Sequence, residues 1–176
     1  MDYVEKMVKP NCIYKGKIIT LRCDDAELPD GRPCTREFVE HGGGACVLYV
    51  KEGKVLFVRQ YRYAYAESIY EIPAGKIDKG EEPIKTAIRE LEEEGGLVAD
   101  ELKLLYVMYP SPGYTNEKIY IYQALSASET KAHLDDGEYL DVEYLPLEKV
   151  KEMLQKGEIK DAKTIIALQA YFLSLQ

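Results

Sequence analysis

Apolar residues along this chain follow two different periods, and the period separates strand-like from helix-like segments. Runs rich in β-branched and aromatic residues, which are typical of strands, occupy 13–22, 37–41, 45–50, 55–61, 68–72, 102–108, 118–124 and 139–145. Helical spacing marks 147–155, 162–175 and the segment that contains Ile84, Ala87, Ile88 and Leu91. The pattern predicts an α/β (α+β) fold in which a mixed β-sheet lies between helices.

The first two strand-like runs are separated by a polar turn, Pro29-Asp30-Gly31-Arg32-Pro33. A hairpin that precedes all other elements predicts an N-terminal β arm over residues 1–42. No repeat and no low-complexity linker interrupts the sequence. We therefore expect a single domain over residues 1–176, with its core at 43–176.

The segment from Ile84 to Glu94 has the most unusual arrangement of polar residues. At about 100° per residue, its apolar side chains form one stripe that we expect to face the core. Three glutamates lie on the flank of that stripe, and other charged residues point away from it into water. The flank holds Glu90, Glu93 and Glu94, and the water-facing group is Lys85, Arg89 and Glu92. Gly95-Gly96 follows, and glycine commonly ends a helix.

Carboxylates near the C-terminal end of a helix oppose its dipole, and like charges one turn apart cost about 0.3 kcal/mol per pair. One interpretation is a solvated acidic face. The other is a cation site, because oxygen ligands grouped on one flank suit Mg²⁺ or Mn²⁺, which bind carboxylates together with substrate phosphates. We favour the metal site, since a bound cation would offset the repulsion among Glu90, Glu93 and Glu94.

The spacing of residues across 75–97 resembles the signature of a known family. The matching positions, Gly75, Glu81, Arg89-Glu90-Leu91, Glu93-Glu94 and Gly96-Leu97, reproduce the Nudix box of the Nudix hydrolases without a departure. The resemblance implies a strand–loop–helix unit that binds Mg²⁺ and hydrolyses a nucleoside diphosphate linked to another group. The expected fold is then a Nudix-type mixed sheet, with residues 43–176 as its catalytic core.

Glu90 and Glu94 are the expected metal ligands, with Glu93 as a further ligand or as the residue that positions water. By resemblance, the carbonyl of Ala74 completes the metal site. A general base must reach the attacking water and be ionised. Glu138 matches the family's catalytic loop glutamate, although Glu93 or Glu94 could serve instead, and a polar turn is the other interpretation of Glu138.

Segments outside the box resemble one subfamily, the ADP-ribose pyrophosphatases. They are VRQYRYAYAESIYEIPAGKID, the Ser111-Pro112-Gly113 loop, DGEYLDVEYLPL and KGEIKDAKTIIAL. The resemblance implies hydrolysis of ADP-ribose to AMP and ribose 5-phosphate. Arg62 matches a position that lies against the diphosphate, where a guanidinium can make bidentate contacts. An exposed arginine at a strand end is the other interpretation.

Glu37, Lys76 and Ser111 are further candidates for substrate binding by resemblance. Some relatives stack a tryptophan on the adenine, and this chain has none. Arg36, Tyr14 or another tyrosine would have to take that place.

Composition narrows the class of protein. A net charge of −8 argues against general affinity for nucleic acid or an anionic membrane. No apolar run approaches the roughly 20 residues of a membrane span, and the first residues lack the apolar core of a signal peptide. The four cysteines show no C-x-x-C spacing, which favours free thiols. We expect a cytoplasmic enzyme with a small-molecule nucleotide-sugar substrate.

The resemblance also implies a homodimer that exchanges N-terminal segments, with Tyr61, Tyr63 and Tyr65 as candidates for its interface. Two alternatives to ADP-ribose hydrolysis remain open. One is the same chemistry on another nucleoside diphosphate sugar, such as GDP-mannose. The other is a non-catalytic Nudix domain that senses a nucleotide sugar.

Overall fold

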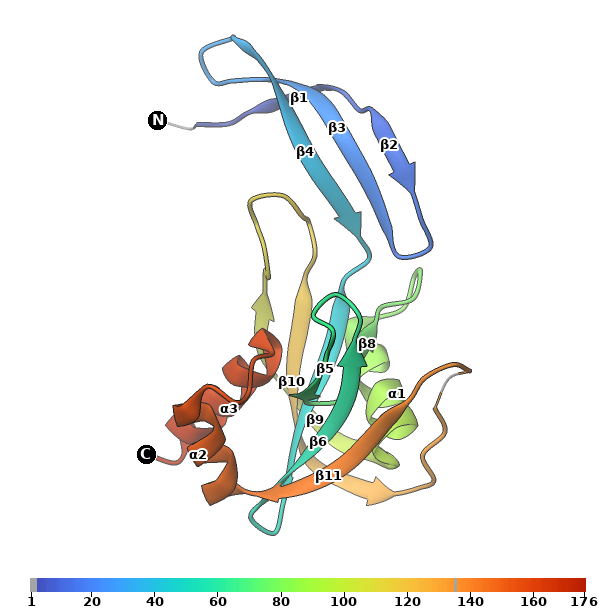
Figure 1. Cartoon of the computed structure of the whole chain (residues 1–176), viewed down its shortest axis with the longest axis vertical. Coiled ribbons are helices and arrows are strands. Elements are labelled where there is room, and N and C mark those ends of the chain that lie inside the picture. The colour runs from blue at the N-terminus through green and yellow to red at the C-terminus, as the bar shows by residue number, and fades with distance from the viewer. Residues whose placement is uncertain (1–2, 135) are drawn as a thin grey trace. The chain divides into compact units, whose positions relative to one another are not determined.

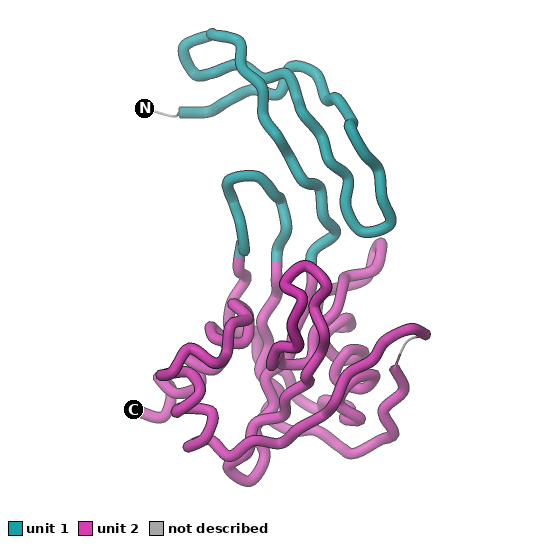
Figure 2. Tube along the Cα trace, in the orientation of Figure 1, with its two compact units in different colours: residues 1–43, 109–118 teal, residues 44–108, 119–176 magenta. Residues whose placement is uncertain are grey.

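The computed structural model describes residues 3–134 and 136–176, which divide into two compact units. Figure 2 colours the first unit, residues up to 43 together with 109–118, differently from the second, 44–108 together with 119–176. The loop Tyr109–Lys118 therefore clusters with the N-terminal strands, although it is far from them in sequence.

In the described part of the first unit, antiparallel strands form one four-stranded sheet (Figure 1). The strands are β1 (Lys6–Lys9), β2 (Cys12–Lys15), β3 (Ile19–Glu27) and β4 (Pro33–His41). β1 and β2 pair with successive parts of β3, and β4 pairs along the whole of β3. The loop 109–118 joins this unit through an isolated bridge between Val39 and Thr115.

The expected single strand over 13–22 is wrong. The chain turns at Gly16, whose N–H donates to the carbonyl of Ile19 at 2.9 Å, so this range contributes to both β2 and β3. The expected hairpin arm is consequently a four-stranded sheet. The turn lies at Lys15-Gly16-Lys17, a short polar stretch that the sequence analysis included in one strand although its glycine is a turn signal.

A larger mixed sheet forms the second unit (Figure 1). Among the described residues its strands are β5 (Gly44–Lys51), β6 (Lys54–Arg62), β7 (Glu67–Glu71), β8 (Ala74–Lys76), β9 (Leu97–Met108), β10 (Ile119–Glu129) and β11 (Leu140–Pro146). The main path runs β11-β6-β5-β10-β9, with β7 paired to β6 and β8 paired to β5. β5 and β10 are parallel and the other pairs are antiparallel.

Helices cover both faces of this sheet, because neighbouring strand residues point to opposite sides. On one face, α1 (Pro83–Gly95) packs Ala87 and Leu91 against Val47. On the other, α2 (Leu147–Lys156) and α3 (Ala162–Ser174) pack against Leu48 and its neighbours. The predicted mixed sheet between helices is confirmed. Within the described residues, no helix is long and apolar enough to cross a membrane.

The face that α1 buries differs from the predicted stripe. Ile84 is 40% exposed, whereas Glu90 and Glu94 are buried beside Ala87 and Leu91. The helix is therefore rotated so that carboxylates, rather than Ile84, point inward. The contacts that stabilise this rotation are made with β8.

Candidate active site

Strand β8 runs beside β5 and brings its backbone to the buried face of α1. The carbonyl of Pro73 accepts the Val47 N–H at 2.9 Å, and β8 pairs with the start of β5. Glu94, only 3% exposed, accepts the Ala74 N–H through Oε2 at 2.8 Å. Burial raises the pKa of Glu94 to about 8, although the Ala74 N–H favours the ionised form. The last turn of α1 is thereby fixed to the strand that precedes the helix.

Glu90 occupies the space next to Gly75. A Cβ at position 75 would lie 1.8 Å from Oε1 of Glu90, so only glycine leaves room for this carboxylate. Burial raises the pKa of Glu90 to about 7, against the opposing charge of Arg89. The position of the Glu90 carboxylate therefore depends on a glycine at residue 75.

Arg89 holds several carboxylates together. Its Nη1 donates to Glu90 at 2.6 Å and to Glu93 at 2.8 Å, and its Nε donates to Glu81 at 3.3 Å. Nη2 reaches the carbonyl of Lys76 at 3.1 Å. The expectation that Arg89 points into water is wrong, because its guanidinium reaches back to three glutamates.

The segment before Glu138 is attached to the end of α1. Gly96, with φ of 64°, ends the helix, and its carbonyl accepts the Thr130 N–H at 2.8 Å. The His133 N–H donates to the carbonyl of Glu93 at 3.0 Å. The charge of Glu138 contributes to the raised pKa of both Glu90 and Glu94, which brings it into the same electrostatic neighbourhood.

The donor chemistry of this site fits a hard divalent cation. It consists of the buried carboxylates of Glu90 and Glu94, the half-buried Glu93 and an excess of negative charge, with raised pKa values of Glu90 and Glu94 that a cation would lower. Among the described residues, no three acidic, histidine or cysteine side chains are already grouped as a ligand set. Arg89 instead pairs with Glu90 and Glu93.

Arg62 borders a separate hollow of about 370 Å³ within the second unit, lined also by Tyr63, Tyr65 and Ile69. Its Nε and Nη2 donate to the two carboxylate oxygens of Glu71 at 2.5 and 2.7 Å. Lys76 belongs to β8 and contributes its carbonyl to Arg89, while its side chain is exposed.

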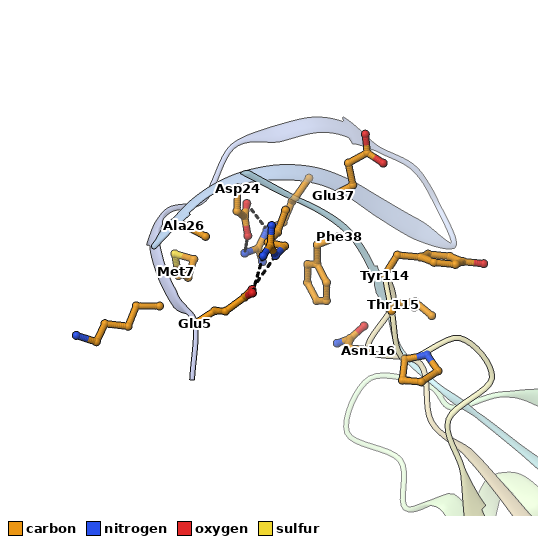
Figure 3. Close-up of a pocket in the computed structure, with 14 residues that line it drawn as sticks. Glu5, Met7, Asp24, Ala26, Glu37, Phe38, Tyr114, Thr115 and Asn116 are labelled. Carbon is orange, nitrogen blue, oxygen red and sulfur yellow. Dashed lines mark hydrogen bonds and ion pairs between the residues drawn. The ribbon is translucent and has the colours of Figure 1, made fainter. Parts of the chain in front are cut away.

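The other substrate-binding candidates, Glu37 and Ser111, belong to the first unit. A hollow of about 400 Å³ lies there between the sheet and the loop 109–118. Arg36 and Phe38 share one face of β4, whereas Glu37 borders the hollow with its carboxylate pointing away from Phe38 (Figure 3). Ser111 supplies a carbonyl that accepts the N–H groups of Tyr114 and Thr115.

The edge of the Arg36 guanidinium is paired with a carboxylate of β1's flanking segment. Its Nε and Nη2 donate to Glu5 at 2.7 and 2.5 Å, which Figure 3 marks with dashed lines. The guanidinium of Arg22 lies 4.9 Å from the centre of the Phe38 ring. Aromatic and guanidinium surfaces are therefore gathered in this hollow without a tryptophan.

Glu71 and Lys163 are polar residues that the sequence analysis did not single out. Both are buried and paired with each other, and Glu71 also holds Arg62. One signal was present, because Glu71 stands between Tyr70 and Ile72 in a strand-like run where a charge is unusual.

Comparisons with known proteins identify the family of this chain. Residues 40–168 match the NUDIX domain, and residues 13–39 match the nucleoside diphosphate sugar hydrolase N-terminal domain. The chain therefore belongs to the Nudix family.

Two relatives are similar over nearly their whole length. The ADP-ribose pyrophosphatase of Bacillus subtilis (strain 168) is 43% identical over 168 residues, which are 94% of this chain and 91% of that protein. The methanol dehydrogenase activator of Bacillus methanolicus is 41% identical over 177 residues, which are 99% and 95% of the two chains. A solved structure described as an ADP compounds hydrolase shares the fold, with a TM-score of 0.80 at 22% identity over 97% of this chain and 96% of that one.

Proposed function

We propose that this protein hydrolyses the diphosphate bond of ADP-ribose, with Mg²⁺ or Mn²⁺, to give AMP and ribose 5-phosphate. The observation that carries the proposal is the pair of buried carboxylates, Glu90 and Glu94, which α1 places against β8. The substrate follows from the similarity to the Bacillus subtilis ADP-ribose pyrophosphatase.

The metal site would consist of the Ala74 carbonyl with Glu90, Glu93 and Glu94. When bound, the cation supplies charge stabilisation for the phosphoryl oxygens of the substrate. Arg89 contributes by holding Glu90 and Glu93 close together before the cation arrives. Ion binding would then require Arg89 to give up part of its contact with these carboxylates.

Glu138 is the proposed general base, which takes a proton from the attacking water. Glu93 is the alternative, because Arg89 already orients its carboxylate at 2.8 Å. Arg62 would contact the diphosphate, since its Nη1 edge is not used in the bidentate pair with Glu71. Glu37, Lys76 and Ser111 are the further proposed substrate contacts.

A substrate panel tests the proposal directly. The purified protein is incubated with ADP-ribose, ADP-glucose, GDP-mannose or ATP in the presence of Mg²⁺, and the products are separated. We expect AMP and ribose 5-phosphate from ADP-ribose at the highest kcat/KM. Faster turnover of GDP-mannose would replace the substrate assignment, and tight binding without turnover of any compound would favour a nucleotide-sugar sensor.

Glu94→Gln tests the metal site. The amide keeps an oxygen for the Ala74 N–H but loses the charge that a cation needs, so the fold should persist while kcat falls by about 10³-fold or more. Wild-type rates in this variant, at an unchanged melting temperature, would contradict the assignment of Glu94 as a ligand.

Glu138→Gln tests the general base. We expect kcat to fall by about 10²- to 10⁴-fold while KM changes little, because proton transfer rather than binding is lost. Glu93→Gln is measured in parallel. If only the Glu93 variant loses kcat, the base is Glu93 and Glu138 has no part in proton transfer.

A second candidate function follows from the similarity to the methanol dehydrogenase activator, which extends over 99% of this chain. In this second candidate function, the protein increases the activity of a methanol dehydrogenase. The test adds wild type or Glu94→Gln to a methanol dehydrogenase assay. Activation by both would indicate a role independent of hydrolysis, whereas no activation by either would remove this candidate.

A further inference from the structure

A cluster of four charges, of which Glu71 and Lys163 are buried, connects the start of α3 to the end of β7. Glu71, 1% exposed, accepts hydrogen bonds from Arg62 at 2.5 and 2.7 Å and also from the ammonium of Lys163. Lys163, 9% exposed, lies 3.0 Å from Asp161 as well. Two cations and two carboxylates thus share one site with no net charge.

The same turn of α3 also holds the backbone of the strand. The Thr164 hydroxyl accepts the Ile72 N–H at 3.0 Å and donates to Asp161 at 2.5 Å. Asp161 caps α3 by accepting the Thr164 N–H at 3.0 Å. Lys163 and Thr164 therefore fix the Glu71 side chain and the next backbone amide, two residues before Ala74.

Stability alone is a weak explanation for this cluster. Desolvating charges costs several kcal/mol per ion, and apolar residues of similar volume often stabilise a core as well as a buried ion pair does. What the cluster supplies is orientation. Burial opposes ionisation of Glu71, but Arg62 and Lys163 outweigh it and hold the pKa of Glu71 below its usual range.

Arg62 is fixed at one edge and open at the other. Glu71 engages Nε and Nη2, which sets the plane of the guanidinium and leaves Nη1 outside the pair. The Arg62 side chain is 40% exposed and borders the hollow lined by Tyr63 and Tyr65. The orientation of its open edge therefore depends on where Glu71 is held.

We propose that Lys163 is a positioning residue for the reaction. It holds Glu71, and through it Arg62, in the orientation that receives the diphosphate of the substrate. This inference rests on the proposed function, in which Arg62 contacts the diphosphate. Without Lys163, two carboxylates would face Arg62 alone, and the guanidinium would be drawn toward them at the expense of the substrate.

Lys163→Met removes the charge while keeping an unbranched side chain of similar length. We expect KM for the best substrate of the panel to rise by about tenfold or more, with a smaller change in kcat. Lys163→Arg restores the cation and should recover most of the affinity. Should Lys163→Met fail to fold, as judged by circular dichroism, Lys163→Gln replaces it. An unchanged KM in a folded variant would overturn the proposal.

Lys160→Met is the matched control. Lys160 precedes α3, as Asp161 does, and pairs at 2.8 Å with Glu67 on the same strand β7, but both side chains are exposed. Its removal should leave kcat and KM within about twofold of wild type, because exposed pairs contribute little. An equal rise in KM in both variants would show that Lys163 has no special role.

Coupling to Arg62 separates positioning from a merely structural effect. If Lys163 acts through Arg62, Lys163→Met should cause no further loss in an Arg62→Met background, so the two effects are non-additive. If the losses multiply, Lys163 affects activity by another route and the proposal is wrong. An unchanged KM in Arg62→Met alone would also overturn it, while hydrolysis of ADP-ribose would stand.

Failure of the proposed function has a different signature. If the wild type turns over none of the panel, the function is wrong, and the same coupling is measured as Kd for ADP-ribose by calorimetry. Non-additive losses in Kd would still support Lys163 as a positioning residue for a binding site. If the wild type neither turns over nor binds ADP-ribose, both proposals are overturned.

Discussion

Glu90 and Gly75 show how a single missing side chain shapes the site. The carboxylate of Glu90 lies where a Cβ of residue 75 would be, only 1.8 Å from its Oε1. Gly75→Ala should therefore push the carboxylate out of place by an ångström or more. Because misplacement of that order costs about 10²-fold in rate, we expect kcat/KM to fall by at least that factor.

The melting temperature of Gly75→Ala identifies the cause of the loss. The carboxylate is the flexible end of the Glu90 side chain, so it can move aside without unfolding α1. The melting temperature should therefore change little. Retention of wild-type kcat/KM by a folded Gly75→Ala variant would show that the position of Glu90 is not important for the reaction.

At the scale of elements, the loop between β8 and α1 is clamped to the helix by one carboxylate. Glu81 accepts the Thr86 hydroxyl at 2.7 Å and the Asp78 N–H at 3.2 Å, and pairs with Arg89. The Arg89 hydrogen bond, the largest cause, lowers the pKa of Glu81 to about 2. Its ionised form therefore stabilises the folded state.

This clamp predicts a pH-dependent stability. Because the folded-state pKa of about 2 lies below the ordinary 4.5, the contribution is complete above pH 4.5 and is lost as the pH falls toward 2. Glu81→Gln should lower the melting temperature by about 2–4 °C at pH 7, for a loss near 1 kcal/mol. Measured by calorimetry at successive pH values, this difference should narrow below pH 4.5.

Glu82→Gln is the control for the clamp, since Glu82 is the exposed neighbour and lies 3.8 Å from Lys85. We expect it to change the melting temperature by less than Glu81→Gln does. A difference between wild type and Glu81→Gln that stays constant from pH 7 to pH 3 would show that Glu81 is not specially stabilised in its ionised form.

The strands and helices were largely predictable because the apolar period depends only on nearby residues. The acidic flank of α1 was also predictable, since Glu90 and Glu94 share one side of any helix. The rotation of α1 about its own axis was not predictable. It depends on Gly75 and the Ala74 N–H, which approach the helix from β8. Arg89 was misplaced for the same reason.

For the molecule as a whole, the sequence showed the local signals but not the long-range pairings. Lys163 lies 92 residues from Glu71, and neither side chain suggests the other from its local pattern. The clustering of Tyr109–Lys118 with the N-terminal sheet is of the same kind. Such contacts depend on topology, which propensity and periodicity do not specify.

The first unit exposes several large apolar side chains. Val8, Ile13 and Ile18 are each more than half exposed, and Met7 and Tyr14 are similarly open. Large apolar side chains exposed on a small sheet are candidates for an interaction site. We therefore predict that the protein is a homodimer and that the N-terminal sheet contributes to its interface, as the resemblance to ADP-ribose pyrophosphatases implies.

Sedimentation equilibrium of the wild type and of a Val8→Glu, Ile13→Glu variant tests this prediction. Val8 lies on β1 and Ile13 on β2, so the two charges fall on different strands of the same sheet. Burying two unpaired carboxylates in an interface costs several kcal/mol, which should convert the dimer to a monomer at micromolar concentration. In contrast, Leu173→Glu on the exposed end of α3 should leave the mass unchanged. A monomeric wild type would refute the dimer, and a variant that remains dimeric would place the interface elsewhere.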